Sequence, residues 1–375
     1  MTELYIGLMS GTSLDGADGV LVDFAPPDTG SVLRVLAHRH RPFAPDLAAE
    51  LLALNSPGDN ELHRAALAGN ALARVYAEVV EALLMESGAA RDRVRAIGAH
   101  GQTVRHRPQE FDNTGYTLQL GNAALLAELC GIDVVADLRS RDVAAGGQGA
   151  PLVPAFHRAV FGVEGQTVGV LNIGGISNLT VLGADGSTLG FDCGPGNALM
   201  DHWCQTHTGR AFDNAGSWAA SGRVIEPLLN AMMADPYFSL AAPKSTGRDR
   251  FNPAWLSAHL RAPPAPPPPV DVQATLAALT ATCCANDVRH CAAGATELLV
   301  CGGGALNQHL MRQIAARLPG AVVRPSDERG LPAMQVEAAA FAWLARAFSA
   351  REPASLSSVT GASGARILGA LYPAT

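Results

Sequence analysis

Tyr5-Ile-Gly-Leu-Met-Ser-Gly-Thr-Ser-Leu-Asp-Gly-Ala-Asp-Gly-Val-Leu-Val-Asp23 contains two apolar runs joined by a turn rich in Gly, Ser and Thr. Because the chain leaves the turn through the apolar run Val20-Leu21-Val22, the turn joins two strands and does not open a helix. Its glycines let backbone N–H groups approach a ligand closely, and successive N–H groups form a concavity that binds anions. Two interpretations are open: a strand-turn-strand unit that binds nucleotide phosphates, and a tight hairpin without a ligand.

The turn is not a Walker loop, because no Gly-Lys-Ser or Gly-Lys-Thr follows it. The hydroxyl groups of Ser10, Thr12 and Ser13 are additional donors. Asp15 and Asp18 add carboxylates, which can hold a metal ion or its waters beside a phosphate.

A second segment, Val168-Gly-Val-Leu-Asn-Ile-Gly-Gly-Ile-Ser-Asn-Leu-Thr-Val-Leu182, has the same order of parts: apolar run, Gly pair, hydroxyl, apolar run. Two such hairpins, one opening each half of the chain, predict a duplicated domain. Duplication favours the phosphate-binding interpretation of both turns, because two equivalently placed hairpins can bind one triphosphate.

A third glycine-rich turn, Gly302-Gly-Gly304, follows the strand-like run Glu297-Leu-Leu-Val-Cys301 and precedes a helix expected at residues 305–318. A helix that begins at such a turn can present its N-terminus to a ligand. We expect this turn to lie at the nucleoside end of a bound nucleotide.

Strand-like and helix-like runs alternate along the chain, which indicates an α/β fold. Strands are expected at residues 95–100, 116–120 and 134–137, and helices at 62–84, 122–130 and 336–348. The apolar C-terminal segment Gly364–Tyr372 is expected to pack back on the body of the protein.

Composition limits the possible functions. The chain has 375 residues, enough for two domains, and its 48% apolar and 16% charged residues are typical of a globular protein. A net charge of -7 argues against nucleic acid or an anionic membrane as a partner. We expect no signal peptide and no membrane-spanning segment. The seven cysteines form no CxxC pair, and Cys283, Cys284 and Cys291 are expected to be free thiols, so we expect a cytoplasmic location.

Phe191-Asp-Cys-Gly-Pro-Gly-Asn197 carries the strongest catalytic candidate, Asp192. Asp192 ends a strand before a loop that cannot be helical, which predicts a place at the sheet edge where α/β proteins bind ligands. A carboxylate near bound phosphates can act as a general base. The alternative is a turn aspartate that bonds its own backbone, but two phosphate-type turns in the same chain favour catalysis.

Other polar clusters have two interpretations each. The segment Asp137–Asp142 contains two arginines, which can bind a carboxylate bidentately or form a surface ion-pair network. The polar loop Lys244–Arg248 could contact phosphate or only solvent. Glu337 begins an expected helix, where it can favour the helix dipole or point toward a ligand.

Seven motifs together resemble the bacterial anhydro-N-acetylmuramic acid kinase family, and they cover nearly the whole chain in the family's order. They are Gly7-Leu-Met-Ser-Gly-Thr-Ser-Leu-Asp-Gly16, His100-Gly-Gln-Thr103, Arg141-Asp-Val-Ala-Ala-Gly-Gly-Gln-Gly149, Asn172-Ile-Gly-Gly-Ile-Ser-Asn178, Phe191-Asp-Cys-Gly-Pro-Gly-Asn197, Lys244-Ser-Thr-Gly247 and Cys301-Gly-Gly-Gly304.

The resemblance implies the fold of sugar kinases, heat-shock ATPases and actin: two related actin-like (ribonuclease H-like) α/β domains hinged around an ATP cleft. We expect one domain at residues 1–137, completed by 357–375, and the other at 138–356. The implied reaction opens the 1,6-anhydro ring of 1,6-anhydro-N-acetylmuramic acid with water. The γ-phosphoryl group of ATP is transferred to O6, giving N-acetylmuramic acid 6-phosphate and ADP in peptidoglycan recycling. The resemblance also implies Mg²⁺ as a cofactor and a homodimer.

The resemblance assigns roles to individual residues. Asp192 would be the base for the water that attacks C1. The sugar would be bound by Thr103, Arg139, Arg141 and Glu337, and Ser140 stands between the two arginines where relatives suggest another arginine. The residues that would bind ATP are Gly11, Thr12, Ser13, Leu14, Asp15, Gly16, Ala17, Asp18, Gly174, Gly175, Ser177, Gly302, Gly303 and Gly304.

Three alternatives remain at this stage. A simple hexose or amino-sugar kinase would use Asp192 to deprotonate a sugar hydroxyl without ring opening. An ATP-driven chaperone or filament protein of the same fold would need further binding surfaces. A pseudo-enzyme would bind nucleotide without chemistry, which the presence of Asp192 argues against.

Overall fold

The computed structural model describes residues 3–11, 13–24, 32–247, 250–261 and 266–375 of the chain. The predicted ligand residue Thr12 and Arg248 of the polar loop lie outside the described residues. Contacts divide the chain into two compact units, one formed by residues 1–160 with 335–375 and the other by 161–334. These limits differ from the expected ones, because residues 138–160 and 335–356 pack within the first unit.

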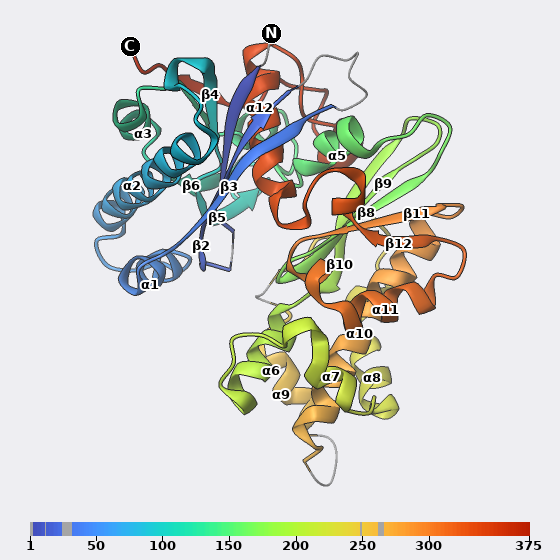
Figure 1. Cartoon of the computed structure of the whole chain (residues 1–375). Helices are drawn as coiled ribbons and strands as arrows, with labels where there is room; N and C mark the ends of the chain where they lie inside the picture. Colours follow the sequence, from blue (N-terminus) through green and yellow to red (C-terminus); the bar gives the residue numbers. More distant parts are fainter. Residues whose placement is uncertain (1–2, 12, 25–31, 248–249, 262–265) are drawn as a thin grey trace. The chain divides into compact units, whose positions relative to one another are not determined.

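The first unit is built on a six-stranded mixed sheet in the order β13-β7-β4-β1-β2-β3. Figure 1 labels β2, β3 and β4 of this sheet. β1, β2 and β3 are antiparallel neighbours, whereas β4 runs parallel to β1 and β7 parallel to β4. The C-terminal β13 pairs with β7, which confirms that the chain end packs back on the body. The strands are β1 (Leu4–Met9), β2 (Gly16–Asp23), β3 (Arg34–Pro42), β4 (Val94–Ala99), β7 (Val134–Ala136) and β13 (Ala370–Tyr372).

The second unit repeats this topology in a five-stranded sheet ordered β10-β9-β8-β11-β12. Its first three strands are antiparallel neighbours, and β11 and β12 continue in parallel from β8. In both sheets the third, second, first, fourth and fifth strands therefore lie side by side, and the predicted pair of related α/β domains is confirmed. The strands are β8 (Val168–Ile173), β9 (Ile176–Leu182), β10 (Thr188–Pro195), β11 (Glu297–Cys301) and β12 (Val322–Pro325).

Two long helices cover opposite faces of the first sheet. Gly7 and Gly98, paired across β1 and β4, approach α12 (Val336–Ser349) so closely that a Cβ would lie 1.9 and 2.0 Å from carbonyl oxygens of that helix. Gly19 faces the other way, where a Cβ would lie 2.3 Å from a valine of α2 (Glu61–Ser87). Because successive strand residues point to opposite faces, the register of β1 and β2 puts α12 and α2 on opposite sides.

The remaining helices are shorter, except for α10. The first unit adds a two-stranded sheet of β5 (Gln102–Pro108) and β6 (Gly115–Leu120). It also contains the helices α1 (Pro45–Ala53), α3 (Ala123–Cys130), α4 (Ser140–Val143) and α13 (Ser357–Thr360), and α5 (Val153–Phe161) ends where the second unit begins. The second unit contains α6 (Ala198–Thr208), α7 (Ser217–Ser221), α8 (Glu226–Met233), α9 (Pro253–Leu260), α10 (Pro269–Cys291) and α11 (Gln308–Arg317).

The predicted strands at 95–100, 116–120 and 134–137 are confirmed as β4, β6 and β7, and the three predicted helices as α2, α3 and α12. Both hairpins are strand-turn-strand units, as predicted. Cys283 and Cys284 are buried free thiols in α10, and Cys291 is free and partly exposed. Within the described ranges, the structure contains no helix long and apolar enough to cross a membrane.

The helix after the third glycine turn differs from its prediction. Residues Gly303–Leu306 form a 3₁₀ helix, and α11 begins only at Gln308. The side chain of Asn307 accepts a bond from Leu310 N at 3.0 Å and so caps α11. The expectation that an α-helix N-terminus opens at this turn is therefore wrong, because the chain makes one 3₁₀ turn first.

Candidate active site

The turn between β1 and β2 is attached to the end of β4. Ser10 is buried, and its Oγ donates to Gly101 O at 3.0 Å and lies 3.0 Å from Tyr76 Oη. The Gln102 side chain donates to Gly11 O at 3.1 Å. Ser10 was expected as a ligand donor, but its hydroxyl bonds Gly101 and holds the turn in place.

The outer part of the turn leaves room beside its backbone. A Cβ on Gly11 would find its nearest neighbour, Ser13 Oγ, at 3.6 Å, which is ordinary contact. Ser13 Oγ donates to Asp15 Oδ1 at 2.5 Å, and both side chains are exposed. Gly16 differs, because a Cβ there would lie 2.4 Å from Arg41 O on β3. The strand pairing thus explains Gly16, whereas nothing in the described chain requires a glycine at position 11.

The last candidates of this turn are less exposed to a ligand. Leu14 has a positive φ of 58°, and its N–H donates to Gly11 O at 3.3 Å. Ala17 is buried in β2. Oδ1 of Asp18 lies 3.2 Å from Nε2 of His38 and 3.2 Å from Nδ1 of His40, so this carboxylate is bound to β3. Asp15 is therefore the carboxylate of the turn that remains exposed.

His100, at the end of β4, connects this turn to the predicted arginine cluster. Its Nδ1 lies 3.3 Å from Ser10 O, and its Nε2 accepts bonds from Arg139 Nε at 3.2 Å and Nη2 at 2.9 Å. Burial, together with the Arg139 charge, lowers the pKa of His100 to about 3, so the ring is neutral with Nδ1 as its donor. Arg139 also donates to Gly149 O at 2.8 Å, and burial lowers its pKa to about 10.

The other predicted sugar-binding residues also belong to the first unit. Glu337, in the first turn of α12, raises the pKa of Arg139 through its charge and so partly offsets the effect of burial. Thr103 on β5 accepts a bond from the Gln119 side chain at 3.2 Å. Arg141 is exposed on α4. The structure thus brings Arg139 and Glu337 into electrostatic contact.

Asp142 holds the loop that follows α4. Its carboxylate accepts bonds from Gly149 N at 2.8 Å and from the Thr360 hydroxyl at 2.8 Å. A Cβ on Gly147 would lie 2.2 Å from the same carboxylate. Instead of joining an ion-pair network, Asp142 fixes the glycine-rich loop and with it the Gly149 carbonyl that Arg139 uses.

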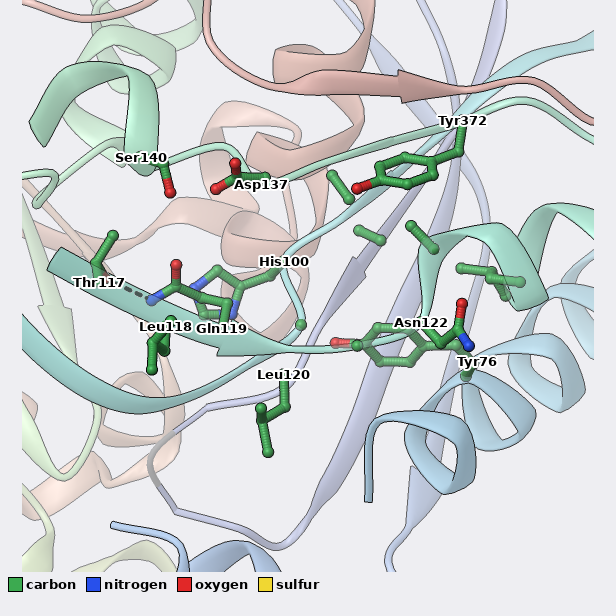
Figure 2. Close-up of a pocket in the computed structure, with 17 residues that line it drawn as sticks. Tyr76, His100, Thr117, Leu118, Gln119, Leu120, Asn122, Asp137, Ser140 and Tyr372 are labelled. Carbon is green, nitrogen blue, oxygen red and sulfur yellow. Dashed lines mark hydrogen bonds between the residues drawn. The ribbon is translucent and has the colours of Figure 1, made fainter. Parts of the chain in front are cut away.

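A cavity of about 270 Å³ lies at the ends of β4 and β7 in the first unit. Figure 2 shows the Tyr372 hydroxyl pointing toward Asp137 and the Asp137 carboxylate pointing toward Ser140. Gln119 crosses the opposite side, where it donates to Thr117 at 2.8 Å. None of the described residues that line the cavity is a lysine or an arginine, so its chemistry suits a neutral polar group and not a phosphate.

In the second unit, the turn between β8 and β9 meets the loop after β10. The N–H groups of Gly196, Asn197 and Ala198 donate to the carbonyl oxygens of Gly174 and Gly175 at 2.8–3.2 Å. A Cβ on Gly174 would find its nearest neighbour at 3.6 Å, so this glycine, like Gly11, has room beside it. The backbone at both predicted phosphate turns is therefore accessible on one side.

Ser177 has a different place from the one expected. It is fully buried, and its Oγ donates to Gly194 O at 3.1 Å. It therefore links β9 to β10 and does not present its hydroxyl to a ligand.

The third glycine turn lies at the same sheet edge, because β11 pairs in parallel with β8 and Cys301 stands opposite Asn172. Gly302 has a φ of 74°, and a Cβ on Gly304 would lie 2.4 Å from Ile173. The second unit thus brings Gly174, Gly175 and the 302–304 turn together at the carboxyl ends of two parallel strands, where α/β proteins bind ligands.

Asp192 lies on β10, next to a bulge between Asp192 and Gly194. Its Oδ2 accepts bonds from Ser245 Oγ and from Thr246 N, both at 3.0 Å. Among the described residues, none donates to Oδ1. Burial raises the pKa of Asp192, although the two bonds from Thr246 and Ser245 oppose the shift. An oriented carboxylate with one free oxygen and a raised pKa has the properties of a general base.

The sequence singled out the polar loop at Lys244, but it did not predict that this loop bonds Asp192 and Asp287. The Lys244 side chain is only 3% exposed, and its Nζ donates to Asp287 Oδ1 at 3.0 Å. The signal that could have revealed this pair is Asp287 itself, a carboxylate on a stretch of α10 whose buried neighbours are mostly Ala, Cys and Leu.

Comparison with known proteins gives a consistent result. A model of the family described as anhydro-N-acetylmuramic acid kinase matches residues 3–374. A protein of Variovorax paradoxus (strain S110) described by that name is 63% identical over 99% of this chain and 99% of its own length. One from Albidiferax ferrireducens is 61% identical over the full length of both. Among solved structures, the activator of the 2-hydroxyisocaproyl-CoA dehydratase from Clostridium difficile covers 94% of this chain and 97% of its own, at 13% identity. Its TM-score of 0.46 is too low to support an argument about this chain.

Proposed function

The chain belongs to the anhydro-N-acetylmuramic acid kinase family, and on that premise we propose its reaction in detail. Water opens the 1,6-anhydro ring of 1,6-anhydro-N-acetylmuramic acid, and ATP phosphorylates O6. The products are N-acetylmuramic acid 6-phosphate and ADP, so that the enzyme recovers a sugar from peptidoglycan turnover.

Asp192 is the proposed base of this reaction. Its carboxylate removes a proton from the water that attacks C1, the bond between C1 and O6 breaks, and O6 takes the γ-phosphoryl group as ADP leaves. The observation that supports this role is the asymmetric carboxylate: Oδ2 is held by Ser245 and Thr246 at 3.0 Å, and Oδ1 is left for the water. The raised pKa of Asp192 also makes it a better proton acceptor than an ordinary aspartate.

ATP is bound, in this proposal, by the backbone of the glycine turns in each unit. The accessible backbone at Gly11 and Gly174 supports phosphate contacts, and the 302–304 turn is assigned to the adenosine side. Phosphoryl transfer depends mainly on positioning and charge neutralisation, which such turns supply.

The residues also fit a Mg²⁺ ion that is carried by the phosphates. Within the described part of the chain, no group of three His, Cys, Asp or Glu side chains is placed to hold a metal. Mg²⁺ in kinases needs only one or two carboxylates besides phosphate oxygens, and the exposed Asp15 would supply one of them. When bound, the ion would neutralise charge on the transferring phosphoryl group.

The sugar is proposed to meet Thr103, Arg139, Arg141 and Glu337. A half-buried arginine beside a neutral histidine is suited to a carboxylate, and the lactyl group of the substrate carries one. Arg141 is the exposed partner for the same group. We further propose a cytoplasmic homodimer, as the family resemblance suggests.

Mass spectrometry in ¹⁸O-water tests the proposal against a simple hexose or amino-sugar kinase. The protein is incubated with ATP, Mg²⁺ and 1,6-anhydro-N-acetylmuramic acid. Ring opening adds phosphate plus one water, with the label at C1, whereas plain phosphorylation of a hexose or amino sugar adds phosphate alone. A product without the label at C1 would rule out hydrolytic ring opening.

A further inference from the structure

Asp192 is part of a closed set of contacts that the reaction scheme does not use. Its backbone N–H donates to Lys244 O at 3.0 Å, and the Tyr237 hydroxyl donates to its carbonyl oxygen at 2.6 Å. The Lys244 ammonium lies 5.2 Å from the centroid of the Tyr237 ring and donates to Asp287 at 3.0 Å. Lys244 and Tyr237 thus both bond the backbone of Asp192, and the buried Lys244 ammonium also contacts the Tyr237 ring.

The same segment also holds the Asp192 carboxylate. Ser245 and Thr246 follow Lys244 directly in the chain and both bond Oδ2. Residues 244–247 have no helix or strand structure of their own. Their position must therefore come from anchors, and a shift at Lys244 would move both donors.

The ion pair is an uncommon choice for such a buried place. The side chains of Lys244 and Asp287 are 3% and 12% exposed, so both charges lose most of their hydration. An apolar pair of similar volume is often equally stable or more stable than a buried ion pair. Apolar contacts do not require a particular orientation, whereas the hydrogen bond from the Lys244 ammonium to Asp287 on α10 does. This bond therefore fixes the position at which the loop begins.

We propose that the Lys244–Asp287 ion pair positions the catalytic base by anchoring residues 244–246 to α10, so that Oδ2 of Asp192 is held and Oδ1 is presented to the reacting water. The inference rests on the proposed role of Asp192. Neither Lys244 nor Asp287 contacts the substrate in this account, and both are positioning residues.

The test compares Lys244→Met and Asp287→Asn with the unaltered protein in steady-state kinetics. Misplacement of a reacting group by about 1 Å lowers turnover on the order of 100-fold, so we expect kcat to fall by roughly that factor in both variants. KM for ATP and for the sugar should change less than about threefold, because the binding turns are untouched. Lys244→Arg keeps the cation and should recover part of kcat.

The pH profile separates positioning from simple stability. If the loop shifts, Asp192 loses two hydrogen bonds that favour its charged form, so its pKa rises and the acidic limb of kcat moves to higher pH. The other titratable groups in these contacts are Lys244, Asp287 and Tyr237, and Cys193 is next in sequence. Burial raises the pKa of Asp287, although the bond from Lys244 opposes the shift, so only a limb that moves in both Lys244→Met and Asp287→Asn is assigned to Asp192. Burial raises the pKa of Tyr237 and of Cys193, so both stay neutral over the range measured.

Glu297→Gln is the matched control. Glu297 is a buried carboxylate of the same unit, paired with Arg329 at 2.6 Å at the start of β11, and it contacts no residue of the Asp192 group. Its loss should lower the unfolding temperature and leave kcat and the acidic limb unchanged.

Two results would overturn different statements. If Lys244→Met and Asp287→Asn lose only thermal stability, as Glu297→Gln does, the ion pair is structural and the inference is wrong, while the role of Asp192 stands. If Asp192→Asn keeps near-normal turnover, the proposed mechanism itself fails. Should Lys244→Met not fold, Asp287→Asn and Lys244→Arg give the same two readouts.

Discussion

The Arg139 guanidinium donates two hydrogen bonds to a single acceptor, Nε2 of His100, at 3.2 and 2.9 Å. The other ring nitrogen lies 3.3 Å from Ser10 O, in the turn between β1 and β2. One neutral imidazole therefore connects the proposed sugar-binding arginine to the proposed phosphate turn within the first unit. The pair fixes the direction of the guanidinium, which a carboxylate ligand requires.

His100→Leu should weaken sugar binding. Without its acceptor, the Arg139 guanidinium is no longer oriented, and a hydrogen bond to a charged group contributes about 1.5–3 kcal/mol. We expect KM for the sugar to rise at least about tenfold, with a smaller effect for His100→Gln, which keeps an acceptor. The buried His157 offers the control His157→Leu, for which KM should stay unchanged. Equal KM values for His100→Leu and the unaltered protein would contradict the role of His100.

Acid should destabilise the folded chain through the same histidine and His157. Burial lowers the pKa of each to about 3, whereas a histidine in the unfolded chain titrates near 6.5. Between pH 3 and pH 6.5 the unfolded state binds more protons than the folded state. The contribution of these histidines to the free energy of unfolding is therefore fully present above about pH 6.5 and decreases toward pH 3. Each histidine contributes a slope of up to about 1.4 kcal/mol per pH unit.

Denaturant titrations at pH 7.5, 6 and 5 would measure this slope. In His157→Leu only His100 still titrates, so the part of the slope that comes from the two histidines should fall by about half. An unchanged slope in that variant would show that other groups control acid stability.

The close packing of α12 on the first sheet predicts opposite effects of two glycine substitutions. Gly98→Ala places a Cβ 2.0 Å from a carbonyl oxygen of α12, so the helix must move, and overpacking costs about 1–3 kcal/mol or more. Gly69→Ala lies within α2 with its nearest neighbour at 3.5 Å and should stabilise the helix by up to about 1 kcal/mol. Thermal unfolding of the two variants in parallel measures both effects. A tolerated Gly98→Ala would mean that α12 is less tightly packed than the structure indicates.

Much of the fold follows from local patterns in the sequence. The two hairpins, the long helix α2 and the strands β4 and β7 are visible because their apolar periodicity and turn residues are local signals. The order of the strands in each sheet is a non-local property, and the internal repeat predicted only that the domain is duplicated. The start of α11 could not be read in this way, because both a 3₁₀ turn and an α-helix suit residues 303–306.

The sequence indicated which residues are candidates for the site, but not the contacts that these residues make in the folded chain. Sequence reasoning proposed Asp192 and Arg139 as candidates from their residue types and their places near strand ends; Asp192 lies within β10, and Arg139 follows β7. It could not identify that Ser177 is buried, that His100 bonds Arg139, or that Lys244 pairs with Asp287, because these contacts join segments 17 to 43 residues apart in sequence. Which of several nearby polar side chains is buried depends on packing that no local pattern contains.

Asp192→Asn should separate binding from chemistry. The amide keeps the shape of the carboxylate but cannot accept the proton of the attacking water, and loss of a general base lowers turnover about 10²–10⁴-fold. Binding of ATP and of the sugar, measured by calorimetry, should remain within about threefold of the unaltered protein. Asp185→Asn, in the exposed turn between β9 and β10, is the control and should keep full activity. Near-normal turnover of Asp192→Asn would remove this residue from the mechanism.

Gly11 and Gly174 are glycines that the described part of the fold does not require. Among the described residues around them, a methyl group on Gly11 or Gly174 has its nearest neighbour at 3.6 Å, and neither glycine has a positive φ. Gly11→Ala and Gly174→Ala should therefore change stability by no more than about 0.5 kcal/mol. If the backbone at these turns approaches the phosphates of ATP, the same methyl groups occupy that space, and KM for ATP should rise about tenfold or more. Gly304→Ala is the contrasting variant, because its Cβ would lie 2.4 Å from Ile173 and should lower the unfolding temperature. Unaltered ATP kinetics in both Gly11→Ala and Gly174→Ala would show that these turns do not bind the nucleotide through their backbone.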